Sequence, residues 1–184
     1  MSTPAPASAP ARARRLHRRR AIGADRPAGR SPAGLRIELR QRVRGWAPPP
    51  RELARWASAA LGSRAAGRKL GVCVVAAAES ARLNARYRGR DRPTNVLSFA
   101  PPALPRSPAR GVSLLGELVI CPRVLREEAR AQEKPLRAHW AHLVVHGTLH
   151  LAGYDHQRAA DARRMERREI AVLRRLGFAN PYRS

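Results

Sequence analysis

The sequence predicts a single α+β domain, in which about four strands form a small mixed sheet flanked by about five helices. Three observations predict this fold class. The chain of 184 residues is long enough for one domain with a real core and short for two. Strand-like and helix-like apolar patterns neither alternate strictly nor separate into blocks. Such patterns begin only near residue 35, so we expect the domain to span 35–184.

Residues 1–34 predict a disordered basic extension. They consist mainly of Ala, Pro, Ser, Gly and Arg, with "RARRLHRRR" at their centre and no apolar periodicity. An organelle transit peptide is an alternative interpretation, although the prolines would break an amphipathic helix. We expect the extension to add nonspecific affinity for RNA.

The N-terminal half of the predicted domain contains two strands and two helices. Apolar and charged residues alternate in "LRIELRQRV" (35–43), which is typical of a half-buried strand. Prolines at 48–50 then begin a helix with one apolar face, which ends before Gly62. The apolar run at 71–78 predicts a buried strand, and a short helix follows through 80–89, where a glycine ends it.

The C-terminal half contains two more strands and three helices. Prolines at tolerated positions begin the first two of these helices, whereas a cluster of prolines before them predicts a surface loop. The last helix is amphipathic and directs Met165, Ile170, Leu173 and Leu176 inward. The predicted order is strand 94–100, loop 101–111, strand 113–122, helix 122–133, helix 135–152 and helix 158–176.

The net charge of +24 indicates a polyanionic partner. Without residues 1–34 the charge is still +17, and RNA or DNA is the obvious class. Because nearly all the basic residues are arginines, a coding bias is an alternative explanation, and charge alone does not separate nucleic acid from an anionic membrane. No window approaches the roughly 18 consecutive apolar residues of a membrane span, so we expect a soluble protein. Two isolated cysteines fit a reducing cytosol.

Three histidines at and just beyond the end of the fourth predicted helix (135–152) have the spacing of metal ligands. His146 and His150 lie four residues apart, so a helix projects them from one face. Gly153 would turn the chain in a left-handed conformation and return His156 over that face. Three imidazoles leave one position of Zn²⁺ open, which is typical of a catalytic site.

The residues around these histidines indicate which reaction the predicted metal site would catalyse. The zinc-peptidase pattern H-E-x-x-H-x-x-G-x-x-H requires a glutamate at position 147, where this chain has Gly147, so a peptidase is disfavoured. His142 and Asp155 are candidates for hydrogen bonds that orient the imidazoles. A metal without a protease base in a strongly basic protein points to phosphodiester chemistry, with arginines holding the anion.

The segment "HLVVHGTLHLAGYDH" (142–156) closely resembles the signature of the YbeY-type endoribonucleases, which are bacterial factors for ribosomal RNA maturation and ribosome quality control. Three further segments, 83–99, 116–132 and 163–182, agree with that family in order and spacing. The resemblance covers nearly all of 35–184 and implies an α+β metallohydrolase-like domain.

The resemblance also implies roles for particular residues. His146, His150 and His156 match the family's zinc ligands, with one Zn²⁺ per chain. Arg88 matches an arginine of the active-site cleft, so we expect Arg88 and His146 to be essential for catalysis. Arg90 and Arg92 are expected to contact RNA together with Arg88. Many relatives have Asp where this chain has Asn95, which casts doubt on a catalytic carboxylate there.

The function implied is that of a zinc-dependent, single-strand-specific endoribonuclease. It would act in 3′-end maturation of 16S ribosomal RNA and in 70S ribosome quality control, in the cytoplasm. The expected partners are ribosomal RNA and the small ribosomal subunit, with contacts to a ribosomal protein and an assembly GTPase suggested, and neither membrane nor DNA. Two alternatives are a non-catalytic ribosome assembly factor stabilised by metal, and a zinc peptidase-like hydrolase.

Overall fold

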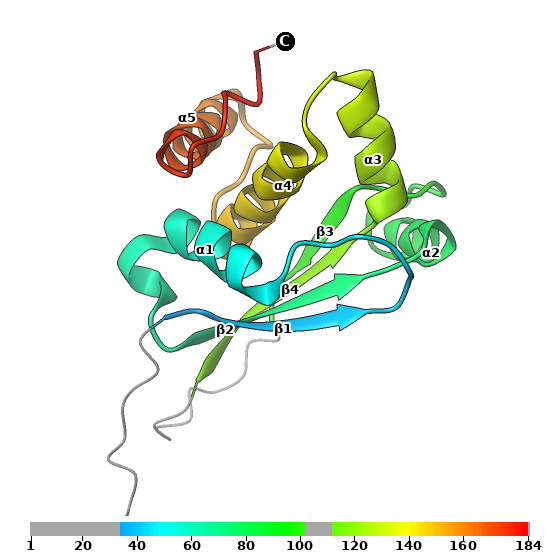
Figure 1. Ribbon diagram of the computed structural model, residues 1–184, viewed down its shortest axis with the longest axis horizontal. Coiled ribbons are helices and arrows are strands. Elements are labelled where there is room, and N and C mark those ends of the chain that lie inside the picture. The colour runs from blue at the N-terminus through cyan, green and yellow to red at the C-terminus, as the bar shows by residue number, and fades with distance from the viewer. Residues whose placement is uncertain (1–33, 102–111, 184) are drawn as a thin grey trace, which may run out of the picture. The chain divides into compact units, whose positions relative to one another are not determined.

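The computed structural model describes residues 34–101 and 112–183, which belong to one compact unit. The predicted extension, apart from Gly34, and the predicted proline-rich loop, apart from Pro101, lie outside the described residues. In chain order the described elements are β1 (Arg36–Gln41), α1 (Pro50–Leu61), η1 (Gly62–Ala65), β2 (Arg68–Val74), α2 (Ala77–Arg88), β3 (Val96–Phe99), β4 (Ser113–Ile120), α3 (Pro122–Ala131), α4 (Leu136–Leu151) and α5 (Ala159–Arg175) (Figure 1).

The four strands form one mixed sheet in the order β1-β2-β4-β3, which confirms the predicted α+β class. β1 and β4 both pair with β2 in parallel, whereas β3 pairs with β4 antiparallel. β3 is therefore an edge strand, and its successive side chains point to opposite faces of the sheet.

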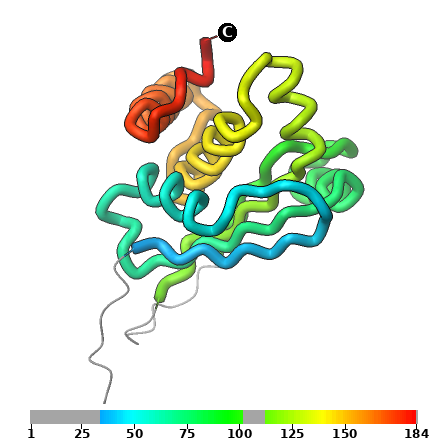
Figure 2. Tube along the Cα trace, viewed as in Figure 1, coloured from blue at the N-terminus to red at the C-terminus, as the bar shows by residue number. Residues whose placement is uncertain are grey.

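One face of the sheet packs against α1 and α4, which lie on the same side of it (Figure 1). Trp56 of α1, Leu118 of β4 and Trp140 of α4 are almost completely buried in this core. α5 packs mainly on α4 and α1, and Figure 2 follows the chain from β1 in blue to this last helix in orange and red.

The opposite face of the sheet has a smaller apolar cluster. Cys73, Val75, Leu97 and Val119 form it, and Leu83 of α2 packs against it. Charged side chains, among them Arg40 of β1 and Glu117 of β4, lie beside this cluster. None of the helices in the described part of the chain is long and apolar enough to cross a membrane.

Two predictions about particular elements were wrong in detail. The strand predicted at 71–78 is β2, which begins earlier, at Arg68, and ends at Val74. Ala77 and Ala78 start α2 instead, because alanine favours a helix more than a strand. In α5 the fully buried residues include Val172, whereas Ile170, predicted to point inward, is only partly buried.

Candidate active site and metal centre

α4 brings the imidazoles of His146 and His150 together. The two residues lie one turn apart, and their Nε2 atoms are 3.2 Å apart. The Nδ1 of His150 lies 3.0 Å from the carbonyl oxygen of Tyr154, which can only accept a hydrogen bond, so this Nδ1 carries the proton. The Nδ1 of His146 lies 2.8 Å from a carboxylate oxygen of Glu169 and is a donor for the same reason.

Both Nε2 atoms therefore present lone pairs to each other in the neutral imidazoles. Two lone pairs at 3.2 Å repel unless a cation lies between them. Two nitrogens bound to one tetrahedral Zn²⁺ at about 2.0 Å are roughly 3.3 Å apart, so the observed spacing fits such an ion.

The third imidazole comes from the turn after α4. The helix ends at Leu151, and Gly153 adopts φ +91°, a conformation that favours glycine. The ring centroid of His156 then lies 4.7 Å from that of His150 and 5.8 Å from that of His146. One ligand nitrogen from each of the three histidines lies within 4.8 Å of the others. The turn predicted at Gly153 thus closes the cluster.

Asp155 fixes the backbone of this turn. Its Oδ1 accepts the backbone N–H of His156 at 2.7 Å and that of Gln157 at 3.3 Å. Among the described residues, these backbone groups are the hydrogen-bond partners of Asp155, and no imidazole is among them. Asp155 therefore acts on the position of His156 through the main chain.

Glu169 of α5 is the carboxylate that contacts the imidazoles. It is completely buried, and it accepts hydrogen bonds from His146 Nδ1 at 2.8 Å, from His142 Nε2 at 2.9 Å and from the hydroxyl of Tyr182. Burial alone would raise the pKa of Glu169, but the hydrogen bonds from His142, His146 and Tyr182 lower it to about 2. The carboxylate is consequently ionised at neutral pH.

Glu169 was not predicted from the sequence, although a signal for it exists. Met165, Glu169, Val172 and Leu173 share the buried face of α5. A glutamate among apolar residues at helical spacing is costly unless a partner satisfies it, so its position pointed to a buried polar contact. His142, predicted as an orienting group, contacts the same carboxylate.

The environment also keeps His150 neutral. Burial, followed by the neighbouring imidazoles of His146 and His156, lowers the pKa of His150 to about 4. At pH 7 the ring is therefore uncharged and its Nε2 can bind a metal ion without first losing a proton.

A second carboxylate–histidine pair, with His139 buried and Glu128 half-buried, lies near the cluster. His139 Nε2 lies 2.8 Å from Glu128, and the side-chain amide of Asn95 donates to both oxygens of that carboxylate at 3.0 and 3.1 Å. Burial would raise the pKa of Glu128, yet the hydrogen bonds from His139 and Asn95 together lower it. Asn95 thus holds the Glu128 carboxylate in place.

Arg88 is the last residue of α2, which Gly89 ends in a left-handed conformation. It lines a cleft of about 280 Å³ together with Asn95 and Ser98 near β3, Tyr182 and the three histidines. No carboxylate of the described residues forms an ion pair with Arg88, so its guanidinium is available to an anion. Arg90 and Arg92 are exposed on the following loop, which Asn84 fixes by donating to the backbone oxygen of Arg92.

Gly147 allows α4 to lie directly on the sheet. A Cβ atom there would be 2.7 Å from Leu118 Cδ2 and 3.0 Å from Ser98 Oγ, so no side chain fits without displacing buried neighbours. The glutamate of the zinc-peptidase pattern therefore has no room at this position, which agrees with the chemistry expected from the sequence.

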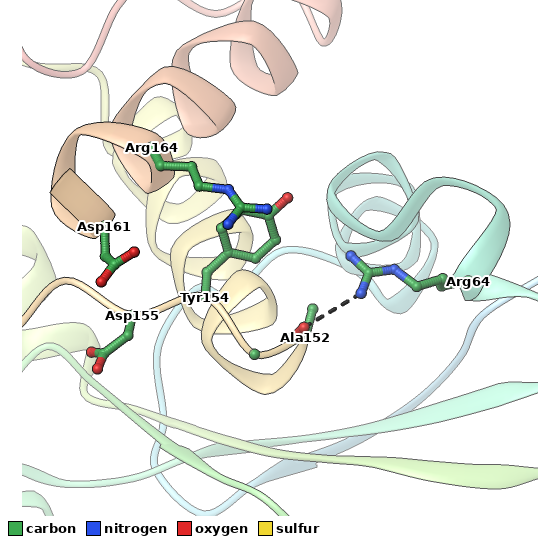
Figure 3. A pocket seen from close by; sticks show the side chains of 7 residues that line it. Arg64, Ala152, Tyr154, Asp155, Asp161 and Arg164 are labelled. Atoms are coloured by element: carbon green, nitrogen blue, oxygen red, sulfur yellow. Dashed lines mark hydrogen bonds between the residues drawn. The ribbon is translucent and has the colours of Figure 1, made fainter.

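A cavity of about 400 Å³ lies beside the turn that carries His156 rather than at the cluster (Figure 3). Arg164 lies 5.6 Å from the ring centroid of Tyr154, and Arg64 Nη1 donates to the carbonyl oxygen of Ala152 at 3.4 Å. These contacts from α5 and η1 hold the turn from both sides, as Figure 3 shows.

An α+β domain with three convergent imidazoles and an unpaired arginine in one cleft is typical of a metal-dependent hydrolase. The family model described as "Endoribonuclease YbeY" matches residues 49–177. The Endoribonuclease YbeY of Alkalilimnicola ehrlichii is 53% identical over 141 residues, which are 74% of this chain and 82% of that protein. The chain belongs to the YbeY endoribonuclease family, which confirms the resemblance found in the sequence.

Among solved structures, the chain is similar to a Thermotoga maritima protein determined in solution. The TM-score is 0.47 at 24% sequence identity, and the match covers 82% of this chain and 99% of that one.

Proposed function

We propose that this protein is a metal-dependent endoribonuclease that cleaves single-stranded ribosomal RNA. The observation that carries the proposal is the convergence of His146, His150 and His156 in the same cleft as Arg88, in a chain of the YbeY endoribonuclease family. The net charge of +24 supports an RNA substrate, because arginines neutralise phosphates.

His146, His150 and His156 would hold one Zn²⁺ per chain. When bound, the ion supplies a Lewis acid for phosphate oxygens and lowers the pKa of a water molecule. The closeness of the two Nε2 atoms, 3.2 Å, supports this assignment, as does the fixed protonation of the other ring nitrogens.

The other residues of the cleft hold the substrate and the ligands. Arg88 binds the scissile phosphate through its permanently charged, planar guanidinium. Glu169 keeps the proton of His146 on Nδ1, and the carbonyl oxygen of Tyr154 does the same for His150. Arg90 and Arg92 contact the neighbouring phosphates.

The biological role proposed is maturation of the 3′ end of small-subunit ribosomal RNA and ribosome quality control. The partners would be the small ribosomal subunit, with a ribosomal protein and an assembly GTPase, in the cytoplasm. Residues 1–34 would add nonspecific RNA affinity, since they contain eight arginines and one acidic residue.

The test is single-turnover cleavage of a labelled single-stranded RNA that carries the unprocessed small-subunit end. Zinc-loaded wild type is compared with His150→Ala and Arg88→Ala purified identically. We expect both variants to lose at least about 100-fold in rate, the usual cost of removing a group that stabilises transition-state charge.

Arg123→Ala is the matched control for Arg88, because Arg123 is an exposed arginine on α3 that forms an ion pair with Glu127 and does not line the cleft. It should cleave at the wild-type rate. Equal cleavage by wild type and His150→Ala, or none by either, would refute the nuclease and favour a non-catalytic assembly factor.

A further inference from the structure

A second cavity lies on the face of the sheet opposite to α1 and α4. Its volume is about 340 Å³, within the range of pockets that hold small ligands. The floor is apolar, with Cys73 of β2, Val75 directly after that strand and Val119 of β4. The function proposed above uses the cleft with the three histidines and assigns no role to this cavity.

The wall of the cavity is an aromatic pair. Tyr87 of α2 and Phe99 of β3 meet edge to face, with ring centroids 4.9 Å apart. Tyr87 is nevertheless 56% exposed, so more than half of its surface is available to a ligand. Arg86 lies 5.6 Å from the centroid of the Tyr87 ring. Unpaired nucleobases stack on exposed aromatic rings of this kind.

The charges around the cavity fit an anion. The two carboxylates of the lining are held by arginines, Glu79 by Arg82 at 2.7 Å and Glu117 by Arg40. Arg42 also lines the cavity and is exposed, and no carboxylate of the described residues forms an ion pair with it. A phosphate beside a stacked base would find this guanidinium free.

Among the described residues, the end of α2 and the edge strand β3 lie between the cavity and the metal cleft. Tyr87 lines the cavity and Arg88 lines the cleft, because neighbouring side chains on a helix differ by about 100° in direction. Their Cα atoms are nevertheless only about 3.8 Å apart. On β3 the alternation of side chains likewise places Phe99 in the cavity and Ser98 in the cleft. One RNA strand that passes over this edge would enter both.

We propose that this cavity is a nucleobase subsite, which binds a base close to the scissile phosphate by stacking on Tyr87 and Phe99. Arg42 binds an adjacent phosphate, so the subsite takes single-stranded RNA, whose bases are free to stack. The inference rests on the RNA cleavage proposed above and names how that substrate is held.

The experiment first maps the cleavage position on a single-stranded RNA with the full-length wild type. A series of RNAs is then made, each with one abasic site at one of the three positions on either side of the cleaved bond. Single-turnover cleavage gives the half-saturating protein concentration and the maximal rate for each RNA. We expect one abasic position to raise the half-saturating concentration of wild type by about tenfold to a hundredfold, the usual effect of one lost stack.

Tyr87→Leu keeps an apolar contact with Phe99 and removes the stacking surface. The half-saturating concentration of this variant for intact RNA should rise by the same factor. An abasic site at the position that affects wild type should then raise it no further. Tyr87→Phe should behave as wild type, which separates loss of stacking from loss of folding. Leu114→Ala, at an exposed position of β4 outside the cavity, is the control and should show no change.

The outcomes distinguish the two proposals. If wild type neither binds nor cleaves the RNA, the proposed nuclease fails and the subsite fails with it. A second outcome is that wild type cleaves, but Tyr87→Leu has the half-saturating concentration of wild type or is affected by the abasic site as strongly as wild type is. Only the subsite is then overturned, and the cavity would suit a protein partner.

Discussion

Replacing Glu169 by glutamine tests whether the metal centre depends on one buried carboxylate. Glutamine has nearly the same shape, but its amide offers one oxygen and one NH₂ group in place of two acceptor oxygens. The carboxylate of Glu169 accepts from His146, His142 and Tyr182. The NH₂ group must therefore face at least one of these donors, and that donor loses its acceptor.

The size of the effect follows from these contacts. A buried donor left without a partner costs about 1–3 kcal/mol, so we expect the metal-free variant to lose about that much stability. Without a carboxylate on Nδ1, the proton of His146 can move to Nε2, the atom that faces His150 at 3.2 Å. Loss of such an orienting partner typically lowers metal affinity by about 10- to 100-fold.

The assays are urea unfolding of the metal-free proteins and competition for Zn²⁺ against a coloured chelator. Glu127→Gln is the matched control, because Glu127 is an exposed carboxylate on α3 whose ion-pair partner in the described part of the chain is Arg123. This variant should bind zinc as wild type does. Wild-type zinc affinity in Glu169→Gln would refute the assignment of Glu169 as the orienting group.

Three other perturbations have definite expected outcomes. Gly147→Ala should destabilise the fold by about 1–2 kcal/mol in urea unfolding, because overpacking against Leu118 outweighs the gain in helix propensity; unchanged stability would contradict the contact. Metal-free protein should melt at lower temperature as the pH falls from 6.5 to 4, since the pKa of His150 is about 4 when folded and the unfolded chain binds the proton first. A further loss should follow from pH 4.5 toward 2 as Glu169 is protonated, and a flat profile over both windows would argue against these shifts. Zinc at 100 times its Kd should stabilise wild type by about 2.7 kcal/mol in a melting assay, but not His146→Ala.

The parts of the site that local sequence determines were predictable. The spacing of His146 and His150 places both on one helical face, and Gly153 returns His156 over it. These relations need only the geometry of a single helix and the conformational freedom of one glycine. The strand and helix count followed from periodicity in the same way.

Features that depend on how distant elements pack were not predictable. Glu169 meets His146 only because α5 crosses α4, and the sequence separation of 23 residues contains no sign of that crossing. The sheet order, in which β4 lies between β2 and β3, is likewise a result of tertiary packing. Asp155 is close to the histidines in sequence, yet its hydrogen bonds go to the backbone.

The contact of Tyr182 with Glu169 has a consequence for how the protein is made. A chain grows from its N-terminus, so all three imidazoles leave the ribosome before Glu169 and well before Tyr182. Until α5 docks, the proton of His146 can sit on either nitrogen. Translation therefore produces the three imidazoles first and the side chains that fix the orientation of His146 later, so the cluster is ordered only after α5 has docked.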